Sequence, residues 1–386
     1  MRKFVAAGLA AVMAVSLAAC QTTEASKSDQ GPGSTQMNAK IDAALADITG
    51  KVLSTGPHGE AAEPASAVEL TDAEIQQVKD KKLTAAIALH YGGNDWANAQ
   101  VAGLTAQFEK LGIEIVAKTD ANFDPAQQVS DIETIMAKHP DIIVSIPTDA
   151  VATASAYKKA AEAGIKLVFM DNAPNGLVAG KDYVTVVSAD NYGNGVVSAH
   201  LMAKTLGGKG DIAVIYHEAD FFVTAQRYEG FKTTIAEQYP DIHVVDTHGI
   251  AGPDFAGDAQ AVADAVITQK PSLKGIWAVW DVPAEGVMAA ARAADRMDLK
   301  IATEDLGTNV AIALAKNELV VGLGAQLPYD QGVAEADAAA GALLGKTAPA
   351  YVAVSALPVT HDNVLDAWRQ VYHAEPPASL AAAFDK

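Results

Sequence analysis

The sequence predicts an α/β protein of two Rossmann-like lobes, each built on a parallel β-sheet. The chain has 386 residues, which is more than one hydrophobic core usually holds. Short continuous apolar runs of strand length alternate with longer amphipathic stretches, as parallel strands joined by crossover helices do. The alternation is interrupted near residues 188–191, where we expect the chain to pass from the first sheet to the second.

The composition is that of an acidic globular protein. Hydrophobic residues make up 50% and charged residues 19%, which excludes wholesale disorder and the fibrous classes. The chain has 28 Lys and Arg against 47 Asp and Glu, a net charge of −19. This charge repels phosphate backbones and no basic stripe compensates for it, so nucleic acid is excluded as the main partner.

The N-terminal sequence has the pattern of an export signal. Two basic residues precede an apolar stretch over 4–17, which is too short to span a membrane comfortably. Small residues then lead to Cys20, the only cysteine, in a run that resembles a bacterial lipobox. We therefore expect residues 1–19 to be a lipoprotein signal peptide and Cys20 to be lipidated. The protein would be exported and lipid-anchored at the cell envelope, in the periplasm or on the outer face of the cytoplasmic membrane. An ordinary secretory signal with a chance cysteine is the alternative.

Residues 20–82 are expected to form a tether and an N-terminal helical extension. The part up to about residue 35 is polar and rich in Ser, Thr and Gly, which predicts a flexible tether. Apolar residues at helical spacing over 41–52 predict a short helix. The Pro/Gly/Glu stretch over 56–64 is expected to be loose, and the capping-box signature at 71–74 predicts the start of a second helix.

Strands and helices alternate from residue 83 onward, and each is predicted from its apolar pattern. The expected strands lie at 85–89, 113–117, 142–146, 166–170, 183–187, 212–216, 243–247, 275–279 and 320–323. The expected helices lie at 97–111, 126–138, 152–163, 196–206, 223–239, 259–269, 284–294, 311–316 and 331–344.

The point of interruption divides these elements between two lobes. Lobe one is expected to comprise 83–189 plus 327–355, and lobe two 190–326 plus 356–386. Three crossovers would form the hinge, near 188–190, 326–328 and 354–358.

Ligands of such sheets bind in loops that follow the carboxyl ends of the strands. Here those loops are rich in Asp, Asn, Trp and Phe. Carboxylates and amides hydrogen-bond hydroxyl groups, whereas aromatic faces cover C–H surfaces, so the combination predicts a neutral polyhydroxylated ligand. A small cationic solute, held by the carboxylates and by cation–π contacts, is the second interpretation.

Five motifs in these loops carry a resemblance to a known family. They are Gly93-Asn94-Asp95-Trp96, Phe169-Met170-Asp171-Asn172, Ser188-Ala189-Asp190-Asn191, Gln226-Arg227-Tyr228-Glu229-Gly230-Phe231 and Ala325-Gln326-Leu327-Pro328-Tyr329-Asp330-Gln331-Gly332. In this order and spacing the chain resembles the ribose/galactose-type periplasmic sugar-binding proteins of ABC importers, in a lipoprotein form. The resemblance implies a type I periplasmic binding protein fold with a three-crossover hinge. It also implies docking on membrane permease and ATPase subunits.

The resemblance further implies a ligand site in the cleft between the lobes. Asp171 and Asp305 would accept ligand hydroxyls from opposite lobes, so we expect alanine at either position to remove most affinity and to leave the fold intact. Arg227 would donate hydrogen bonds, while Trp96 and Phe255 would stack on the ligand. The full set of expected ligand-binding residues is Asn94, Trp96, Asp171, Asn172, Arg227, Phe255, Trp280, Asp281, Asp305 and Gln326.

Two positions depart from the family pattern. Asn172 stands where ribose-type members have Arg, and Trp280 stands where many have Asn. A hydrogen-bond donor is lost and a flat apolar wall is gained, which makes ribose itself doubtful as the ligand. Asp281 either reaches the ligand or caps the next helix. His90 is expected to be structural, and Phe221 is expected either to cover the cleft or to pack in the core.

No motif indicates catalysis, a metal or a cofactor. The nine His residues are scattered without HExxH spacing, and no GxSxG motif occurs. The glycine-rich loop at 207–210 precedes a strand instead of a helix, so it does not fit a P-loop. We therefore expect a monomeric binding protein that is not an enzyme. It would capture a small sugar or sugar alcohol by hinge closure for import, and a sensing receptor without transport remains the alternative.

Overall fold

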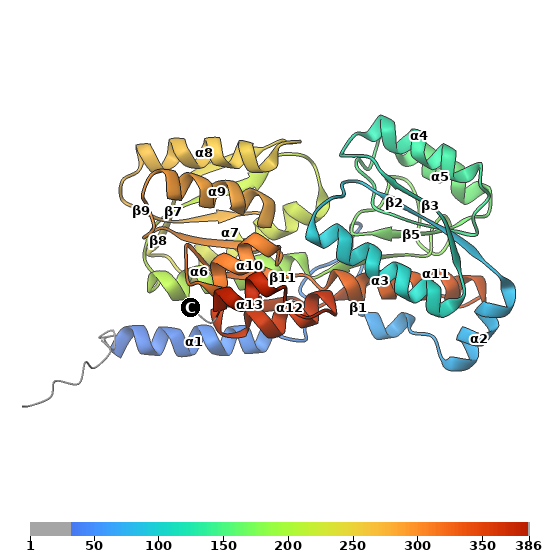
Figure 1. Cartoon of the computed structure of the whole chain (residues 1–386), viewed down its shortest axis with the longest axis horizontal. Coiled ribbons are helices and arrows are strands. Elements are labelled where there is room, and N and C mark those ends of the chain that lie inside the picture. Colours follow the sequence, from blue (N-terminus) through green and yellow to red (C-terminus); the bar gives the residue numbers. More distant parts are fainter. Residues whose placement is uncertain (1–31, 385–386) are drawn as a thin grey trace, which may run out of the picture.

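The computed structural model describes residues 32–384, and it has two lobes side by side (Figure 1). Lobe one is built on strands β1 (Glu63–Pro64), β2 (Thr84–Leu89), β3 (Glu114–Asp120), β4 (Ile142–Ser145), β5 (Lys166–Met170), β6 (Thr185–Ala189) and β12 (Tyr351–Val354). Lobe two is built on β7 (Gly210–His217), β8 (Ile242–Ile250), β9 (Leu273–Ala278), β10 (Lys300–Glu304), β11 (Val320–Ala325) and β13 (Leu357–Val359).

The strand orders are those of two parallel sheets. The order is β1-β12-β6-β5-β4-β2-β3 in lobe one and β13-β11-β10-β9-β7-β8 in lobe two. Among the described strands, only β11 and β13 pair in the antiparallel sense. The predicted fold class, with two Rossmann-like lobes, is confirmed.

Helices cover both faces of each sheet. Those of lobe one are α2 (Asp72–Lys81), α3 (Asp95–Leu111), α4 (Pro125–Met136), α5 (Ala154–Glu162) and α11 (Pro328–Leu343), with the 3-10 turn η1 (Ala65–Val68). Those of lobe two are α1 (Pro32–Ile48), α6 (Asn191–Leu206), α7 (Phe222–Gln238), α8 (Phe255–Gln269), α9 (Asp281–Ala293), α10 (Thr308–Ala315), α12 (Val364–Tyr372) and α13 (Ala378–Phe384), with the 3-10 turn η2 (His361–Asn363).

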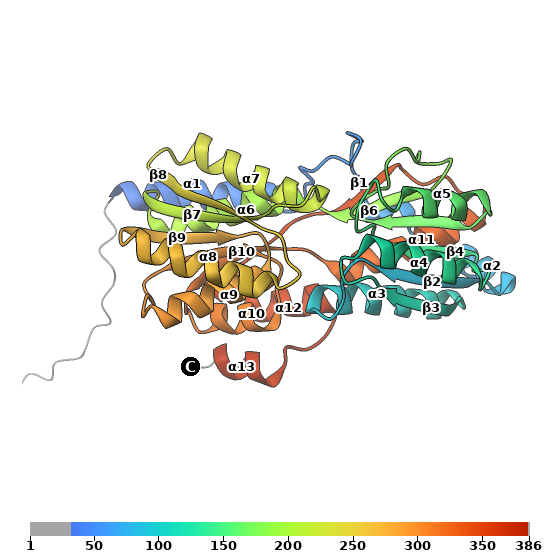
Figure 2. The ribbon, with the colours of Figure 1, turned by 90° about the horizontal axis from the view of Figure 1, so that it is seen from above.

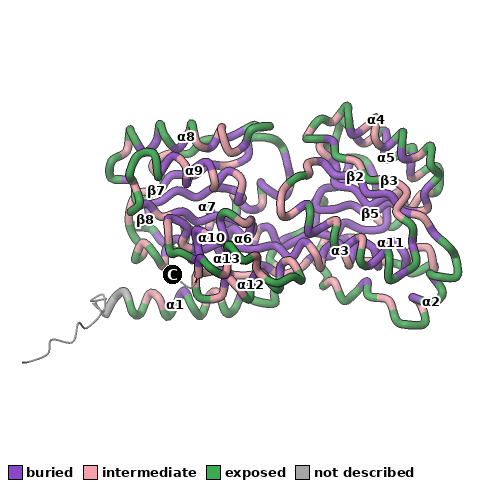
Figure 3. Tube along the Cα trace, in the orientation of Figure 1, coloured by how far each residue is buried: buried purple, intermediate pink, exposed green. Residues whose placement is uncertain are grey.

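The apolar strands are buried on both faces, which explains why their sequences do not alternate with polar residues. On β4, Ile142 and Val144 pack in the core beneath α3 and α11, whereas Ile143 packs in the core beneath α4 and α5. The interiors of both lobes are buried in this way, with exposed residues on the outer helices (Figure 3).

Helix α6 begins five residues before its predicted start at residue 196. Its first turn contains glycine and asparagine, which favour loops in an isolated chain. The side chain of Asp190 caps the helix by accepting a hydrogen bond from the backbone N–H of Gly193. This cap and the surrounding core hold the first turn, in which Asn191 and Asn194 are fully buried.

Three crossovers connect the lobes near the middle of the molecule (Figure 2). They run from β6 to α6, from β11 to α11 and from β12 to β13. The backbone N–H of Asp190, in the first crossover, donates a 2.8 Å hydrogen bond to the carbonyl of Val354 in the third. The crossovers are therefore bonded to one another as well as to their lobes.

The N-terminal extension makes a fourth passage between the lobes. Helix α1 packs on α6 of lobe two, and β1 then adds an edge strand beside β12 of lobe one. The expectation that 56–64 is loose was therefore wrong, because residues 63 and 64 pair with this edge. Helix α1 begins at Pro32, before the predicted end of the tether, and the predicted signal peptide and Cys20 lie outside the described residues. Across residues 32–384, no helix is both long and apolar enough to cross a membrane.

Candidate functional site

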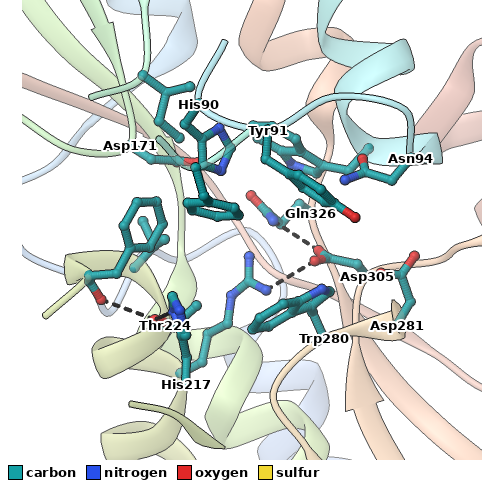
Figure 4. Close-up of a pocket in the computed structure, with 16 residues that line it drawn as sticks. His90, Tyr91, Asn94, Asp171, His217, Thr224, Trp280, Asp281, Asp305 and Gln326 are labelled. Carbon is teal, nitrogen blue, oxygen red and sulfur yellow. Dashed lines mark hydrogen bonds and ion pairs between the residues drawn. The ribbon is translucent and has the colours of Figure 1, made fainter. Parts of the chain in front are cut away.

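A pocket lies between the lobes, at the carboxyl ends of their strands (Figure 4). Lobe one contributes the predicted residues Asn94, Trp96 and Asp171. The predicted residues that line it from the other side are Arg227, Trp280, Asp281, Asp305 and Gln326. The loops after β2, β5, β9, β10 and β11 supply most of these side chains, as the strand-end rule predicts.

Asp171 is the acidic group of lobe one. It follows β5 directly, in the left-handed region with φ of 57°, and its side chain is buried. The hydroxyl of Ser188 donates a 2.6 Å hydrogen bond to its Oδ1 atom. Burial raises the pKa of Asp171 to about 6, although Ser188 and Arg227 both favour the charged form. Among residues 32–384, no cation forms an ion pair with Asp171, although Arg227 acts on it from a distance.

Asp305 is the acidic group of lobe two, and it is fully paired. Its Oδ2 atom lies 2.9 Å from Nη1 of Arg227, and its Oδ1 atom accepts a 2.8 Å hydrogen bond from Nε2 of Gln326. Nε of Arg227 donates to Oδ1 of Asn191 at 2.9 Å. Burial would lower the pKa of Arg227, but Asp305, Glu304 and Asp171 outweigh it and raise that pKa. The guanidinium is thus a permanently charged donor in the pocket wall.

Asp281 both lines the pocket and begins a helix. It is the first residue of α9, and its Oδ1 atom accepts a 2.9 Å hydrogen bond from the N–H of Val282. Burial raises its pKa well above the ordinary value, and the neighbouring carboxylates Asp305 and Glu285 raise it further. Trp280 precedes it and packs edge-on against His217, with the ring centroids 5.5 Å apart.

Three buried polar atoms in the pocket wall are free to bind a ligand. They are Nε1 of Trp96, Nδ1 of His90 and Oε1 of Gln326, and none has a hydrogen-bond partner among the described residues. Buried polar atoms normally have partners, so unpaired ones in a pocket indicate the positions of ligand groups. Asn94 is partly committed, because its Oδ1 atom accepts the N–H of Ala97 at the start of α3.

Two predicted residues lie outside the pocket lining. Asn172 is buried, and its Nδ2 atom donates to the carbonyl of Pro147 at 3.4 Å. Phe255 is 2% exposed and packs edge-on against Trp280 and Phe123 instead of facing the pocket. The expectation that Phe255 stacks on the ligand is therefore corrected: its ring supports the aromatic side chains that do line the site.

Two histidines line the pocket from opposite lobes. His90 follows β2, and its ring stacks on that of Phe221 at 5.5 Å between centroids. Burial lowers the pKa of His90 to about 3 and that of His217 to about 4, so both rings are neutral at ordinary pH. His90 directly follows β2 and His217 ends β7. Both positions were visible in the sequence, but a structural role was favoured for His90. Phe221, for which two roles were open, also lines the pocket.

Phe123 is the most informative residue that the sequence analysis missed. It lies in the loop after the edge strand β3, in the left-handed region with φ of 58°, which is uncommon for a bulky side chain. Its ring packs against the cores of both lobes and lies 5.5 Å from Phe255 and 5.9 Å from Phe221. The strand-end rule applies to β3 as to the other strands, so this loop could have been included.

The lobes are closed on one another beside the pocket. Asp95, at the start of α3 in lobe one, accepts two hydrogen bonds from Thr308, at the start of α10 in lobe two. The donors are the backbone N–H and the hydroxyl, both 2.7 Å from Oδ2 of Asp95. Within residues 32–384, no group of three or more His, Cys, Asp and Glu side chains is placed to hold a metal ion.

Comparisons with known proteins agree with this arrangement. The D-apiose import binding protein of Paraburkholderia graminis is 26% identical over 230 residues, which cover 58% of this chain and 70% of that protein. The ribose import binding protein of Bacillus subtilis is 26% identical over 267 residues, which cover 69% of this chain and 83% of that protein.

The fold matches solved structures as well. An ABC transporter solute-binding protein from Agrobacterium vitis, bound with α-D-tagatopyranose, superposes with a TM-score of 0.70 at 26% identity. The match covers 76% of this chain and 100% of that protein. Residues 85–347 also match the family model described as the periplasmic binding protein domain. The chain therefore belongs to the periplasmic binding protein domain family.

Proposed function

We propose that the protein is an extracytoplasmic solute-binding protein of an ABC importer, and that it captures a small sugar or sugar alcohol between its lobes. The observation that carries the proposal is the pair of buried carboxylates, Asp171 and Asp305, which line one pocket from opposite sides. Relatives named for the import of ribose and of D-apiose support the ligand class. The protein binds and releases its ligand without changing it.

The chemistry of the pocket suits a polyol. Hydroxyl groups donate to carboxylates and accept from donors, and the pocket offers Asp171 as acceptor and Arg227 and Trp96 as donors. Trp280, Phe123 and the other aromatic rings provide flat apolar surfaces for the C–H faces of a sugar. Because Asp305 is already neutralised by Arg227, a neutral ligand does not leave this carboxylate unpaired.

Closure is the proposed mechanism of capture. A ligand that contacts both carboxylates binds the closed form better than the open one, and this difference in affinity shifts the population towards the closed form. The closed protein would then dock on the permease and ATPase subunits of the importer. For this hinge motion we propose lobe boundaries at 83–189 plus 327–355 and at 190–326 plus 356–386.

Lipid anchoring through Cys20 is part of the proposal. We expect that Cys20→Ser releases the protein from the membrane fraction without changing its affinity for the ligand. Fractionation of cells that express either form measures this directly. Retention of the variant in the membrane fraction would show that the lipobox interpretation is wrong.

A cationic solute is the second candidate, and Asp281 favours it. This buried carboxylate has no cationic partner among the described residues, and it lies beside the aromatic side chain of Trp280. A ligand ammonium group would stabilise the charged form of Asp281 and could also contact the indole ring. An amino sugar has both the hydroxyl groups of the first candidate and the ammonium group of the second.

A thermal-shift screen tests the ligand class. The protein is first unfolded and refolded in the absence of small molecules, and then melted with pentoses, hexoses, sugar alcohols and small amines. A ligand at one hundred times its Kd stabilises the fold by about 2.7 kcal/mol, which is a shift of several degrees. A response to sugars or sugar alcohols supports the proposal, a response to amines alone supports the cationic solute, and no response contradicts both.

A further inference from the structure

The N-terminal extension lies outside the residues that match the family model, and it contacts both lobes. Its first part, α1, buries Ile41 and Ile48 against α6 of lobe two. Nζ of Lys204 on α6 also pairs with Asp42 of α1. An apolar stripe on α1 therefore fixes this part of the extension to lobe two. Burial of such a stripe is the main source of stability for a helix packed on a protein.

The second part of the extension is fixed to lobe one. Glu63 and Pro64 pair with Val352 and Ala353 at the edge of the sheet. Further along, Val68 of η1 and Ile75 and Val78 of α2 join the core of lobe one. The two ends of the extension are thus built into different lobes, and residues 49–62 connect them.

The connecting segment is bonded to the hinge itself. The backbone N–H groups of Leu53 and Ser54 and the hydroxyl of Ser54 each donate a 2.8 Å hydrogen bond to the carboxylate of Asp190. Asp190 is fully buried in the first crossover, between β6 and α6. The hydroxyl oxygen of Ser54 also accepts the N–H of Tyr192 at 2.9 Å. A buried carboxylate loses its solvation, and these three donors compensate for that loss together with the N–H of Gly193 on α6.

Two further contacts hold the segment on both sides of this point. Nε2 of Gln226, on α7 of lobe two, donates to the carbonyl of Thr55 at 2.9 Å. Gly56 lies so close to β12 of lobe one that an added Cβ atom would come within 3.0 Å of Tyr351. The segment therefore occupies one position against both lobes when they are arranged as in this structure.

We infer that residues 49–62, which we name the hinge strap, hold the lobes towards the closed arrangement and thereby set the ligand affinity. A rotation of the lobes about the crossovers moves the anchors of the strap, α1 and β1, relative to one another. The hydrogen bonds to Asp190 and Gln226 and the close approach to Tyr351 are all present in this arrangement, and we expect such a rotation to disrupt them. The strap therefore adds to the stability of the closed form before any ligand binds, and a closed form that is more populated raises the apparent affinity.

The test measures the lobe equilibrium directly in the full chain. In a Cys20→Ser background, Thr134→Cys on α4 and Ala265→Cys on α8 place spin labels at exposed positions of the two lobes. Pulsed electron spin resonance of the ligand-free protein then gives the populations of short and long distances. Because no ligand is added, the result does not depend on the proposed sugar.

The variants remove the bonds to Asp190 in steps. Ser54→Ala removes the hydroxyl bond and keeps both backbone bonds, and Leu53→Pro with Ser54→Ala removes a second donor. The matched control is Ser66→Ala, the same change at an exposed position of the extension. We expect the long-distance population to increase several-fold in Ser54→Ala and further in the double variant. The control should leave it unchanged.

Affinity provides the second measurement, with any sugar that the thermal-shift screen identifies. The apparent Kd should rise by the factor by which the closed population falls. Unchanged distance distributions in both Ser54→Ala and the double variant would overturn the inference. Cooperative thermal unfolding confirms that each variant is folded, and if the double variant fails this check, Ser54→Ala alone decides the question.

Discussion

Asp171 and Asp305 are equivalent residues of the two lobes. Each is the first residue after a strand, β5 or β10, and each has a left-handed backbone, with φ of 57° and 64°. Each donates its backbone N–H to the neighbouring strand, Asp171 to Val187 at 2.9 Å and Asp305 to Gly324 at 3.0 Å. The two carboxylates therefore enter the pocket from matching positions, one in each lobe.

Their partners differ. Asp305 is paired with the Arg227 guanidinium at 2.9 Å, whereas Asp171 has the hydroxyl of Ser188 as its hydrogen-bond donor at 2.6 Å. Burial raises the pKa of Asp171 to about 6. Ligand hydroxyls are thus needed to stabilise the charged form of Asp171 more than that of Asp305, and this difference leads to separate predictions for the two residues.

The first prediction concerns pH and Asp171. A ligand hydroxyl that donates to the charged carboxylate lowers its pKa, so affinity should rise as the pH increases through about 6. We expect the Kd for the sugar found in the screen to be about tenfold higher at pH 5 than at pH 7, as one pKa unit corresponds to a tenfold change. Titration calorimetry at several pH values measures this.

Asp171→Asn is the control for this dependence. The amide keeps the shape of the side chain and does not titrate, so the affinity of the variant should be lower and nearly constant between pH 5 and 7. His90 and His217, with pKa values lowered by burial to about 3 and about 4, stay neutral in this range. An unchanged pH dependence in the variant would assign the effect to another group, such as Asp281.

Stability should show the opposite trend for the same residue. The folded-state pKa of Asp171 is raised above its value in the unfolded chain, so the folded state binds the proton more tightly. Its contribution to the free energy of unfolding is therefore fully present below the unfolded pKa and is lost as the pH rises through about 6. Urea unfolding of the ligand-free protein and of Asp171→Asn should differ in pH dependence in this sense.

The second prediction separates Asp305 from Asp171 in their effect on folding. Asp305→Ala leaves the buried guanidinium of Arg227 without its ion pair, and we expect a loss of about 3–5 kcal/mol in the free energy of unfolding. Asp171→Ala should cost much less, because it removes a carboxylate that has no close cation. We therefore expect alanine at Asp171 to leave the fold intact and alanine at Asp305 to weaken it, which revises the earlier expectation of an intact fold for both variants.

Urea unfolding at pH 7 measures both variants. Arg227→Met with Asp305→Leu is a useful third variant, because it replaces the whole ion pair by apolar side chains and should recover part of the lost stability. Equal destabilisation by Asp171→Ala and Asp305→Ala would contradict the assigned role of Arg227.

The third prediction concerns Phe123. Its ring contacts the cores of both lobes in the closed arrangement, so its removal should weaken closure more than it weakens either lobe. We expect Phe123→Ala to raise the Kd by about 10- to 100-fold, which corresponds to about 1.4–2.7 kcal/mol. Phe123→Leu keeps apolar contact and should have a smaller effect. A large fall in the Tm of the ligand-free protein would instead indicate an ordinary core residue.

The fourth prediction concerns the bond between Asp95 and Thr308. Asp95→Ala removes the carboxylate that accepts both hydrogen bonds from Thr308 across the cleft. Hydrogen bonds to charged groups contribute about 1.5–3 kcal/mol. Because this bond joins the two lobes, we expect it to break on opening, so the dissociation rate of the ligand should increase about tenfold or more while the association rate changes little. Stopped-flow kinetics measures both rates.

Asp124→Ala is the matched control for Asp95→Ala. Asp124 also accepts backbone N–H groups at the start of a helix, but these belong to its own helix α4. It should therefore lower stability without affecting ligand release. Equal dissociation rates in the two variants would show that the contact between Asp95 and Thr308 does not hold the lobes closed.

The sequence by itself determined most of the strands and, through the family resemblance, most of the residues that line the pocket. Continuous apolar runs predict strands that are buried on both faces, because any polar residue there would need a partner in a dry interior. Parallel strands place their carboxyl ends at one edge of a sheet, so ligand groups were expected in the loops there, and the family resemblance implied Asp171 and Asp305 among them. Apolar runs and loop motifs are local features, because each depends only on the order of residues within one element or loop.

Only the tertiary structure decided which side chains face the pocket and how the extension is bound. Phe123 and Phe255 lie after strands of different lobes and pack edge-on against each other, with Phe123 in the pocket lining and Phe255 outside it. The hydrogen bonds from Ser54 to Asp190 join residues 136 positions apart. Local periodicity reports the burial of an element, whereas these contacts depend on how separate elements and separate lobes pack together.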